Sequence, residues 1–109
     1  MEIITNHAKA YGIKFSIVES DQEVARAYLY LIYNDLHSEP FGLLEDVHVL
    51  EKDRGRGLGT QLVNEVIRKA QEKGCYKLIA TSRKSRPKVH ALYERLGFVD
   101  HGLEFRIDF

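Results

Sequence analysis

The sequence predicts an α/β fold of the α+β kind, in which helices pack on a mixed sheet. This fold forms one domain over residues 1–109. Short runs of alternating apolar and polar residues before residue 50 are typical of half-buried strands. A glycine-rich loop then leads into an amphipathic helix pattern, and another strand and helix follow. With 109 residues, the chain is long enough for one domain with its own core and too short for two.

The first two alternating runs predict a hairpin. Ile13–Val18 alternates weakly, turn-forming residues occupy positions 19–22, and a longer strand pattern covers Val24–Tyr33. Both faces of the second run carry apolar side chains, so we expect both faces to be covered.

The third strand is predicted over Gly42–Leu50, after a polar loop that ends in a proline. Strict alternation along this strand places Val47 and Val49 on one face. The same alternation places Asp46 and His48 together on the other face.

The second half of the chain predicts a right-handed crossover. The helix pattern Leu58–Lys73 carries a single apolar stripe and stops at Gly74, and Tyr76–Thr81 then predicts a buried strand. A strand, helix and strand of this length imply parallel neighbouring strands. A second helix is expected over Pro87–Gly97, and the tail Phe98–Phe109 is expected to return as one or two strands.

Composition and charge exclude several classes of function. Lys and Arg number 16, as do Asp and Glu, so the formal net charge of +0 recruits neither nucleic acid nor a membrane surface. No window approaches the roughly 18 to 20 apolar residues that span a bilayer.

One cysteine, Cys75, and a polar N-terminal segment favour the cytoplasm, and Cys75 is expected in the core. The histidines show no ligand spacing, so we expect no metal.

The glycine-rich loop reads Arg-Gly-Arg-Gly-Leu-Gly at 54–59. Three glycines let the backbone approach a ligand closely, and N–H groups at the start of the next helix attract anions. Arg54 and Arg56 could add charge-assisted hydrogen bonds to a pyrophosphate. The same residues would also suit a simple solvated turn between strand and helix.

Two motifs give the chain a family resemblance. The loop at 54–59, with Val49 five residues before Arg54, and the run Ala91–Phe98 resemble the two signature motifs of the GCN5-related N-acetyltransferase (GNAT) family, over about residues 42–109. The resemblance implies a sheet in which two neighbouring strands splay apart and acetyl-CoA lies in the gap. The shortened N-terminus of this chain would then lack the helix layer that covers the acceptor side.

The resemblance also assigns the cosubstrate site residue by residue. The backbone of Val47, His48 and Val49 would pair with the pantetheine arm of acetyl-CoA. The pyrophosphate would be wrapped by a continuous segment made of Arg54, Gly55, Arg56, Gly57, Leu58, Gly59 and Thr60. Lys84, Arg86 and Lys88 are candidates near the 3′-phosphate, with a solvated helix start as the alternative for each.

For catalysis, the resemblance makes Tyr93 the general acid that protonates the departing thiolate, although a tyrosine on an apolar stripe is also an ordinary core residue. Glu45 is our choice of general base, because a carboxylate next to the pantetheine segment can accept the amine proton directly or through water. Asp46 would orient the substrate. Surface salt bridges are the alternative role for both carboxylates.

The resulting expectation is an acetyl-CoA-dependent N-acetyltransferase acting on a primary amine of a small molecule. The stretches Leu44–Val47 and Gly74–Leu78 resemble glucosamine-phosphate N-acetyltransferases, whereas Thr81–Pro87 departs from that subfamily. An amino sugar is therefore one candidate acceptor. Two alternatives stay open: acetylation of a protein or peptide amine, and a non-catalytic acyl-CoA-binding module.

The short N-terminal segment also predicts the oligomeric state. Only Met1–Gly12 precedes the first expected strand, which would leave an apolar sheet face bare. Because isolated domains rarely expose such a face, we expect a homodimer whose partner covers it. The aromatic tail, with Phe98, Phe105 and Phe109, is a candidate interface.

Overall fold

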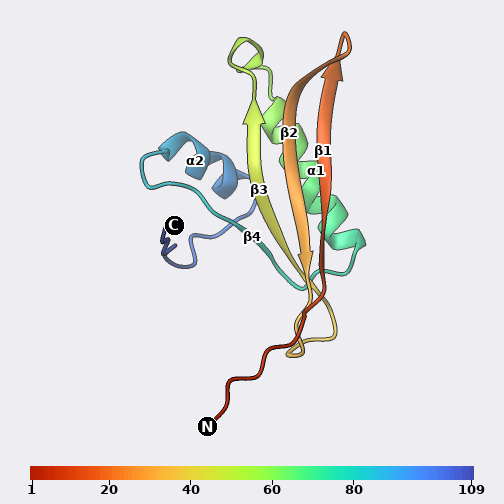
Figure 1. The fold of residues 1–109 in the computed structure, drawn as a ribbon. Helices are drawn as coiled ribbons and strands as arrows, with labels where there is room; N and C mark the ends of the chain where they lie inside the picture. The colour runs from red at the N-terminus through yellow and green to blue at the C-terminus, as the bar shows by residue number, and fades with distance from the viewer.

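The computed structural model describes residues 1–109 and has a four-stranded mixed sheet with two α-helices (Figure 1). In chain order the elements are β1 (Ala10–Glu19), β2 (Gln22–Ile32), β3 (Phe41–Val49), the short 3₁₀ helix η1 (Glu51–Asp53), α1 (Leu58–Glu72), β4 (Leu78–Ala80) and α2 (Pro87–Arg95). The strands lie in the order β1-β2-β3-β4, with β1 to β3 antiparallel and β4 parallel to β3. The expected mixed fold class and the parallel crossover are confirmed.

The β1–β2 hairpin turns at Ser20 and Asp21, which both adopt positive φ angles of 50° and 61°. Aspartate tolerates this left-handed region better than most residues, because its short side chain can bond locally to the backbone. The turn closes the pair Glu19 and Gln22, so the hairpin extends to the very end of both strands. This places the tip of the hairpin beside η1 and the glycine-rich loop, at the top of Figure 1.

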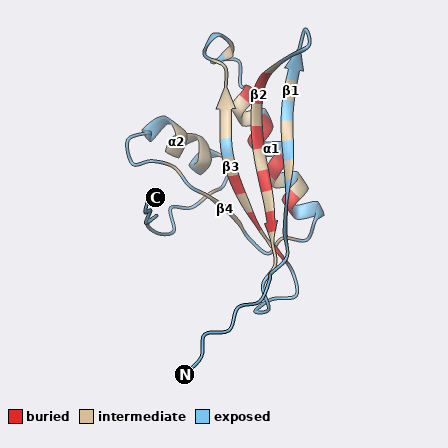
Figure 2. Ribbon diagram, viewed as in Figure 1, coloured by how far each residue is buried: buried red, intermediate tan, exposed pale blue.

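The core lies between α1 and one face of β1 to β3 (Figure 2). The alternate β2 residues Ala25, Ala27, Leu29 and Leu31 are buried there. From α1, the expected stripe Leu58, Leu62, Val63, Val66 and Ala70 is buried against them. Gly74 follows the C-cap residue Lys73, and its φ of 78° lets the Cys75 N–H donate to the Ala70 carbonyl at 3.0 Å.

A bulge in β3 changes the predicted arrangement of faces. Asp46 has a φ of 52°, and the pairing of β2 with β3 shifts between Arg26 and Tyr28, so β3 has one extra residue in the register. Tyr28 pairs with Glu45 and Arg26 pairs with His48. Glu45 and His48 therefore share a face. The prediction that His48 shares its face with Asp46 is wrong, because it assumed unbroken alternation.

Two other expectations differ from the structure. The tail after α2 contains no strand, and its apolar side chains, such as Phe105 and Phe109, are exposed. Strand β4 is shorter than predicted. The sheet face opposite α1, which we expected to lack a helix layer, is not covered by a helix (Figure 1). Tyr28 and Tyr30 are half-buried on this face and stack with ring centroids 6.1 Å apart. Neither helix has the length and apolar composition needed to cross a membrane.

Candidate active site

The site begins where β3 and β4 separate. Their pairing covers only Gly42–Leu44 against Leu78–Ala80, and beyond β4 the chain turns away from β3 toward α2 (Figure 1). The rest of β3, Glu45–Val49, has no strand neighbour on that side. Its outward backbone groups can therefore bind an extended ligand as a further strand would.

A hollow of about 240 Å³ lies at the upper end of this gap. The glycine-rich loop, the first turn of α1 and one side of α2 surround it. The lining residues are Val49, Asp53, Arg54, Gly55, Gly57, Leu58, Gly59, Thr60, Lys88, Leu92 and Arg95. The hollow thus combines backbone N–H groups with several cationic side chains, as a phosphate site requires.

The loop takes its shape from two glycines with positive φ. Gly55 has a φ of 84° and Gly57 a φ of 78°, and Gly57 is also the N-cap of α1. No side chain caps the helix, so the N–H groups of its first turn have no side-chain acceptor. The positive end of the helix dipole therefore lies open at the hollow.

The two loop arginines lie in different places. The Arg54 side chain borders the hollow, and its Nε donates to the Val49 carbonyl at 3.0 Å, which ties the loop to the end of β3. Arg56 instead binds Glu19 through two hydrogen bonds of 2.9 and 2.6 Å, and Asp53 at 3.0 Å. Arg56 does not line the hollow. Of the two arginines expected at a pyrophosphate, only Arg54 lines the hollow.

Helix α2 adds cations that were only partly expected. Of the three candidates near the 3′-phosphate, Lys88 lines the hollow, whereas Lys84 and Arg86 do not. Arg95 also lines it, and its Nη2 donates to the Thr60 hydroxyl at 3.2 Å. Our reading of the sequence missed Arg95. The signal was present, because Lys88, Leu92 and Arg95 follow i, i+4, i+7 spacing and so share one helix face.

Tyr93 is positioned by the end of α2. Gly97, with a φ of 102°, ends the helix and allows the Phe98 N–H to donate to the Tyr93 carbonyl at 2.9 Å. The rings of Tyr93 and Phe98 pack with centroids 5.2 Å apart, the apolar contact that usually accompanies this type of helix end. Tyr93 is half-buried, and its ring and backbone are both held in place.

Glu45 and Tyr93 interact electrostatically across the gap. Burial, followed by the charges of Asp46 and Glu104, raises the pKa of Glu45 above its usual value. Burial and the charge of Glu45 raise the pKa of Tyr93. The structure therefore brings together the two predicted catalytic groups, with a tyrosine that stays protonated and a carboxylate whose pKa is moved toward neutrality.

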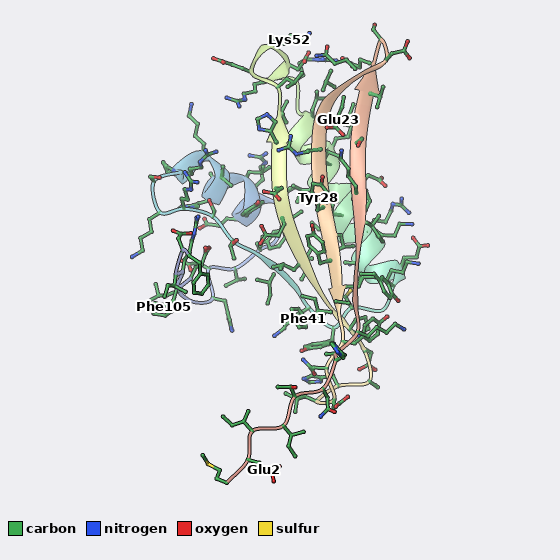
Figure 3. The ribbon with its side chains drawn as sticks, viewed as in Figure 1. Glu2, Glu23, Tyr28, Phe41, Lys52 and Phe105 are labelled. Atoms are coloured by element: carbon green, nitrogen blue, oxygen red, sulfur yellow. The ribbon has the colours of Figure 1, made fainter.

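The remaining predicted site residues lie along the same stretch of β3. Val47 packs against the core, and His48 lies across from Arg26 on the helix-free face, which carries the Tyr28 side chain shown in Figure 3. Asp46, at the bulge, is exposed. The segment predicted to pair with pantetheine is thus the bulged part of β3, where β3 has no strand neighbour on one side.

Comparisons with known proteins agree with this geometry. The model of the acetyltransferase (GNAT) family matches residues 2–98. The glucosamine 6-phosphate N-acetyltransferase of Trypanosoma brucei brucei is 43% identical over 68 residues, which are 62% of this chain and 44% of that protein. A solved Trypanosoma brucei acetyltransferase has a TM-score of 0.77 and 30% identity, covering 92% of this chain and 69% of that one. The solved glucosamine-6-phosphate N-acetyltransferase of Arabidopsis thaliana has a TM-score of 0.80 and 25% identity, covering 90% and 67%.

The curated relatives are longer than this chain. It spans 39% of a relative from Oryza sativa subsp. japonica and 44% of the trypanosomal one, about two fifths of their length.

Proposed function

Because the chain belongs to the acetyltransferase (GNAT) family, we propose that it transfers the acetyl group of acetyl-CoA directly to a primary amine of a small molecule. The observation that carries the proposal is the hollow at the open end of α1, which lies beside an unpaired stretch of β3. The relatives named glucosamine 6-phosphate N-acetyltransferase make that amino sugar the first acceptor to test.

The cosubstrate would lie with its pyrophosphate in the hollow. The backbone of residues 54–60 and the uncapped first turn of α1 would donate to the phosphate oxygens, with Arg54 beside them. The pantetheine amides would pair with the edge formed by Val47–Val49. Lys88 and Arg95 would neutralise the further phosphate charge from the side of α2.

The reaction would proceed by attack of the neutral amine nitrogen on the thioester carbonyl. Glu45 accepts the amine proton, and Asp46 orients the acceptor. As the tetrahedral intermediate collapses, the C–S bond breaks and Tyr93 gives its proton to the CoA thiolate. The raised pKa of Glu45 makes it a stronger base, which supports its role. The raised pKa of Tyr93 keeps the phenol protonated at neutral pH, as a proton donor must be, although it makes the phenol a weaker acid.

Thiol release from acetyl-CoA tests this function. We expect acetyl-CoA-dependent release with glucosamine 6-phosphate or another small amine, and formation of the N-acetyl product by mass spectrometry. CoA binding without release across a wide amine panel would instead favour a non-catalytic acyl-CoA-binding module. Because the sheet face next to Glu45 is not covered by a helix, a peptide amine is the second candidate acceptor, and peptide pools belong in the same panel.

We also infer that the protein is a homodimer in the cytoplasm. Two features support dimerisation: the helix-free sheet face, and the apolar tail side chains Val99, Leu103, Phe105, Ile107 and Phe109, which are all exposed. A second copy would remove this apolar surface from water.

A further inference from the structure

The tip of the β1–β2 hairpin is fastened to the glycine-rich loop. Glu19, the last residue of β1, receives two hydrogen bonds from Arg56, at 2.9 and 2.6 Å. A second contact joins the same hairpin tip to η1, because Lys52 Nζ donates to Gln22 Oε1 at the start of β2 at 3.2 Å. The two residues of the first tie are 37 positions apart in sequence, so this contact is made only when the sheet and the loop have both formed.

Asp53 lies between the Arg56–Glu19 pair and the hollow. Its side chain is 13% exposed, and Arg56 donates to its Oδ1 at 3.0 Å. Its other oxygen, Oδ2, is buried without a hydrogen-bond partner, and Asp53 lines the hollow. A carboxylate at this point repels a phosphate, and the guanidinium of Arg56 is the charge that offsets it.

We propose that Arg56 and Glu19 are positioning residues for acetyl-CoA, and that Arg56 acts from outside the hollow by holding the loop on the hairpin and neutralising Asp53. The inference rests on the proposed function. It assigns to the hairpin tip a part in cosubstrate binding, and it gives Arg56 a role other than direct contact with the pyrophosphate.

The physical reason is preorganisation. Gly55 and Gly57 leave the loop backbone with more conformational freedom than other residues would. Without a fixed support, the loop would have to be ordered each time the ligand binds, and that loss of entropy weakens binding. A bidentate carboxylate–guanidinium pair is directional, so it fixes the loop in one place.

The first test is Glu19→Gln, measured by calorimetric titration with CoA at a temperature where the protein is folded. We expect the dissociation constant to rise roughly threefold to fivefold, the size of a well-formed exposed ion pair. The matched control is Glu65→Gln on α1, which breaks the exposed Arg68–Glu65 pair, also 2.6 Å long. The control should leave CoA affinity unchanged. Unchanged or tighter binding in Glu19→Gln overturns the proposal.

The second test separates charge neutralisation from ligand contact. In the wild-type background, Arg56→Gln should weaken CoA binding roughly tenfold, because the charge of Asp53 is then uncompensated. In an Asp53→Asn background, the same substitution should weaken binding only about threefold to fivefold, the effect of losing the Arg56–Glu19 pair alone, because no carboxylate charge is then left uncompensated. If Arg56→Gln weakens binding equally in both backgrounds, Arg56 contacts the phosphates directly and the proposal is wrong.

Titration of the wild-type protein distinguishes failure of the proposed function from failure of the positioning role. If the wild-type protein does not bind CoA, the proposed function fails. If the wild type binds CoA but the variants show neither the weakening nor the rescue, the positioning role fails and the proposed function stands.

Discussion

Tyr93 on α2 and Glu45 on β3 are half-buried ionisable groups that lie near enough for the charge of Glu45 to act on the Tyr93 phenol. Burial raises the pKa of Tyr93, and the negative charge of Glu45 raises it further. Tyr93 therefore keeps its proton at neutral pH and can donate it to a thiolate. In the proposed mechanism this pair supplies the acid and the base, from two elements that only the folded chain brings together.

Replacing Tyr93 with phenylalanine removes the proton donor and keeps the ring that packs on Phe98. We expect kcat for acetyl transfer to fall on the order of 10²-fold, with the KM for acetyl-CoA and the melting temperature nearly unchanged. Thiol-release kinetics measure kcat and KM, and a thermal melt measures the melting temperature. Full turnover in this variant would show that Tyr93 is only a core residue.

Replacing Glu45 with glutamine tests the base. The pKa of Glu45 is raised, so activity should fall as pH drops through that pKa, at a higher pH than an ordinary glutamate would give. Glu104→Gln removes one of the raising charges and should move this acidic limb of the kcat/KM profile to lower pH. If the acidic limb survives in Glu45→Gln, another group is the base.

The same pKa shift predicts how Glu45 affects stability. A carboxyl group whose pKa is higher in the folded state favours folding at low pH, and this contribution is lost as pH rises through the folded pKa. Glu45→Gln removes the ionisation that burial disfavours. We therefore expect the variant to lose activity while its melting temperature at pH 7 is equal to or above that of the wild type.

Gly57→Val tests the glycine-rich loop. A valine at a φ of 78° costs roughly 1 to 3 kcal/mol in backbone strain, although no atom lies within 4 Å of its Cβ. Gly74→Val is a matched control, because Gly74 has the same φ and the same open surroundings at the other end of α1. Both variants should lose similar stability, but only Gly57→Val should weaken CoA binding. Equal affinities would remove the loop from the site.

Arg95→Gln tests the cations of α2. Arg95 lines the hollow and binds Thr60 at the start of α1, so its loss should weaken CoA binding and reduce the dependence of affinity on salt. The affinities of the variant for CoA and for dephospho-CoA show whether the partner of Arg95 is the 3′-phosphate. If Arg95 binds the 3′-phosphate, the variant should bind dephospho-CoA as tightly as the wild type does.

Light scattering of the purified protein at micromolar concentration tests the homodimer, and we expect twice the mass of the 12.6 kDa chain. Phe105→Asp and Phe109→Asp place charges on exposed tail positions and should shift the equilibrium toward monomer. A monomeric wild type would contradict the dimer and leave the helix-free face to be covered in another way.

The elements with strong local signals were predicted correctly from sequence. Helix α1 has a regular apolar stripe and is followed by Gly74, and two of the three loop glycines, Gly55 and Gly57, occupy positions where φ is positive. These features depend on residues that are close in sequence, where periodicity and backbone preference are informative.

The features that sequence could not show depend on tertiary contacts. The bulge at Asp46 adds one residue to β3 without changing its composition, so alternation gave the wrong face for His48. The contact of Arg56 with Glu19 joins segments that periodicity does not relate. The tail alternates like a strand from Leu103 to Phe109, but no sheet edge pairs with it, so the pattern alone did not make a strand.

The most direct test of the account is a thermal melt of the protein with acetyl-CoA, CoA or ATP. A ligand at 100 times its dissociation constant stabilises the folded state by about 2.7 kcal/mol. For a domain of this size, that corresponds to a rise in melting temperature on the order of 10 °C. We predict this rise with acetyl-CoA and CoA and not with ATP. No shift with either CoA species would contradict the assignment of the hollow as the acetyl-CoA site.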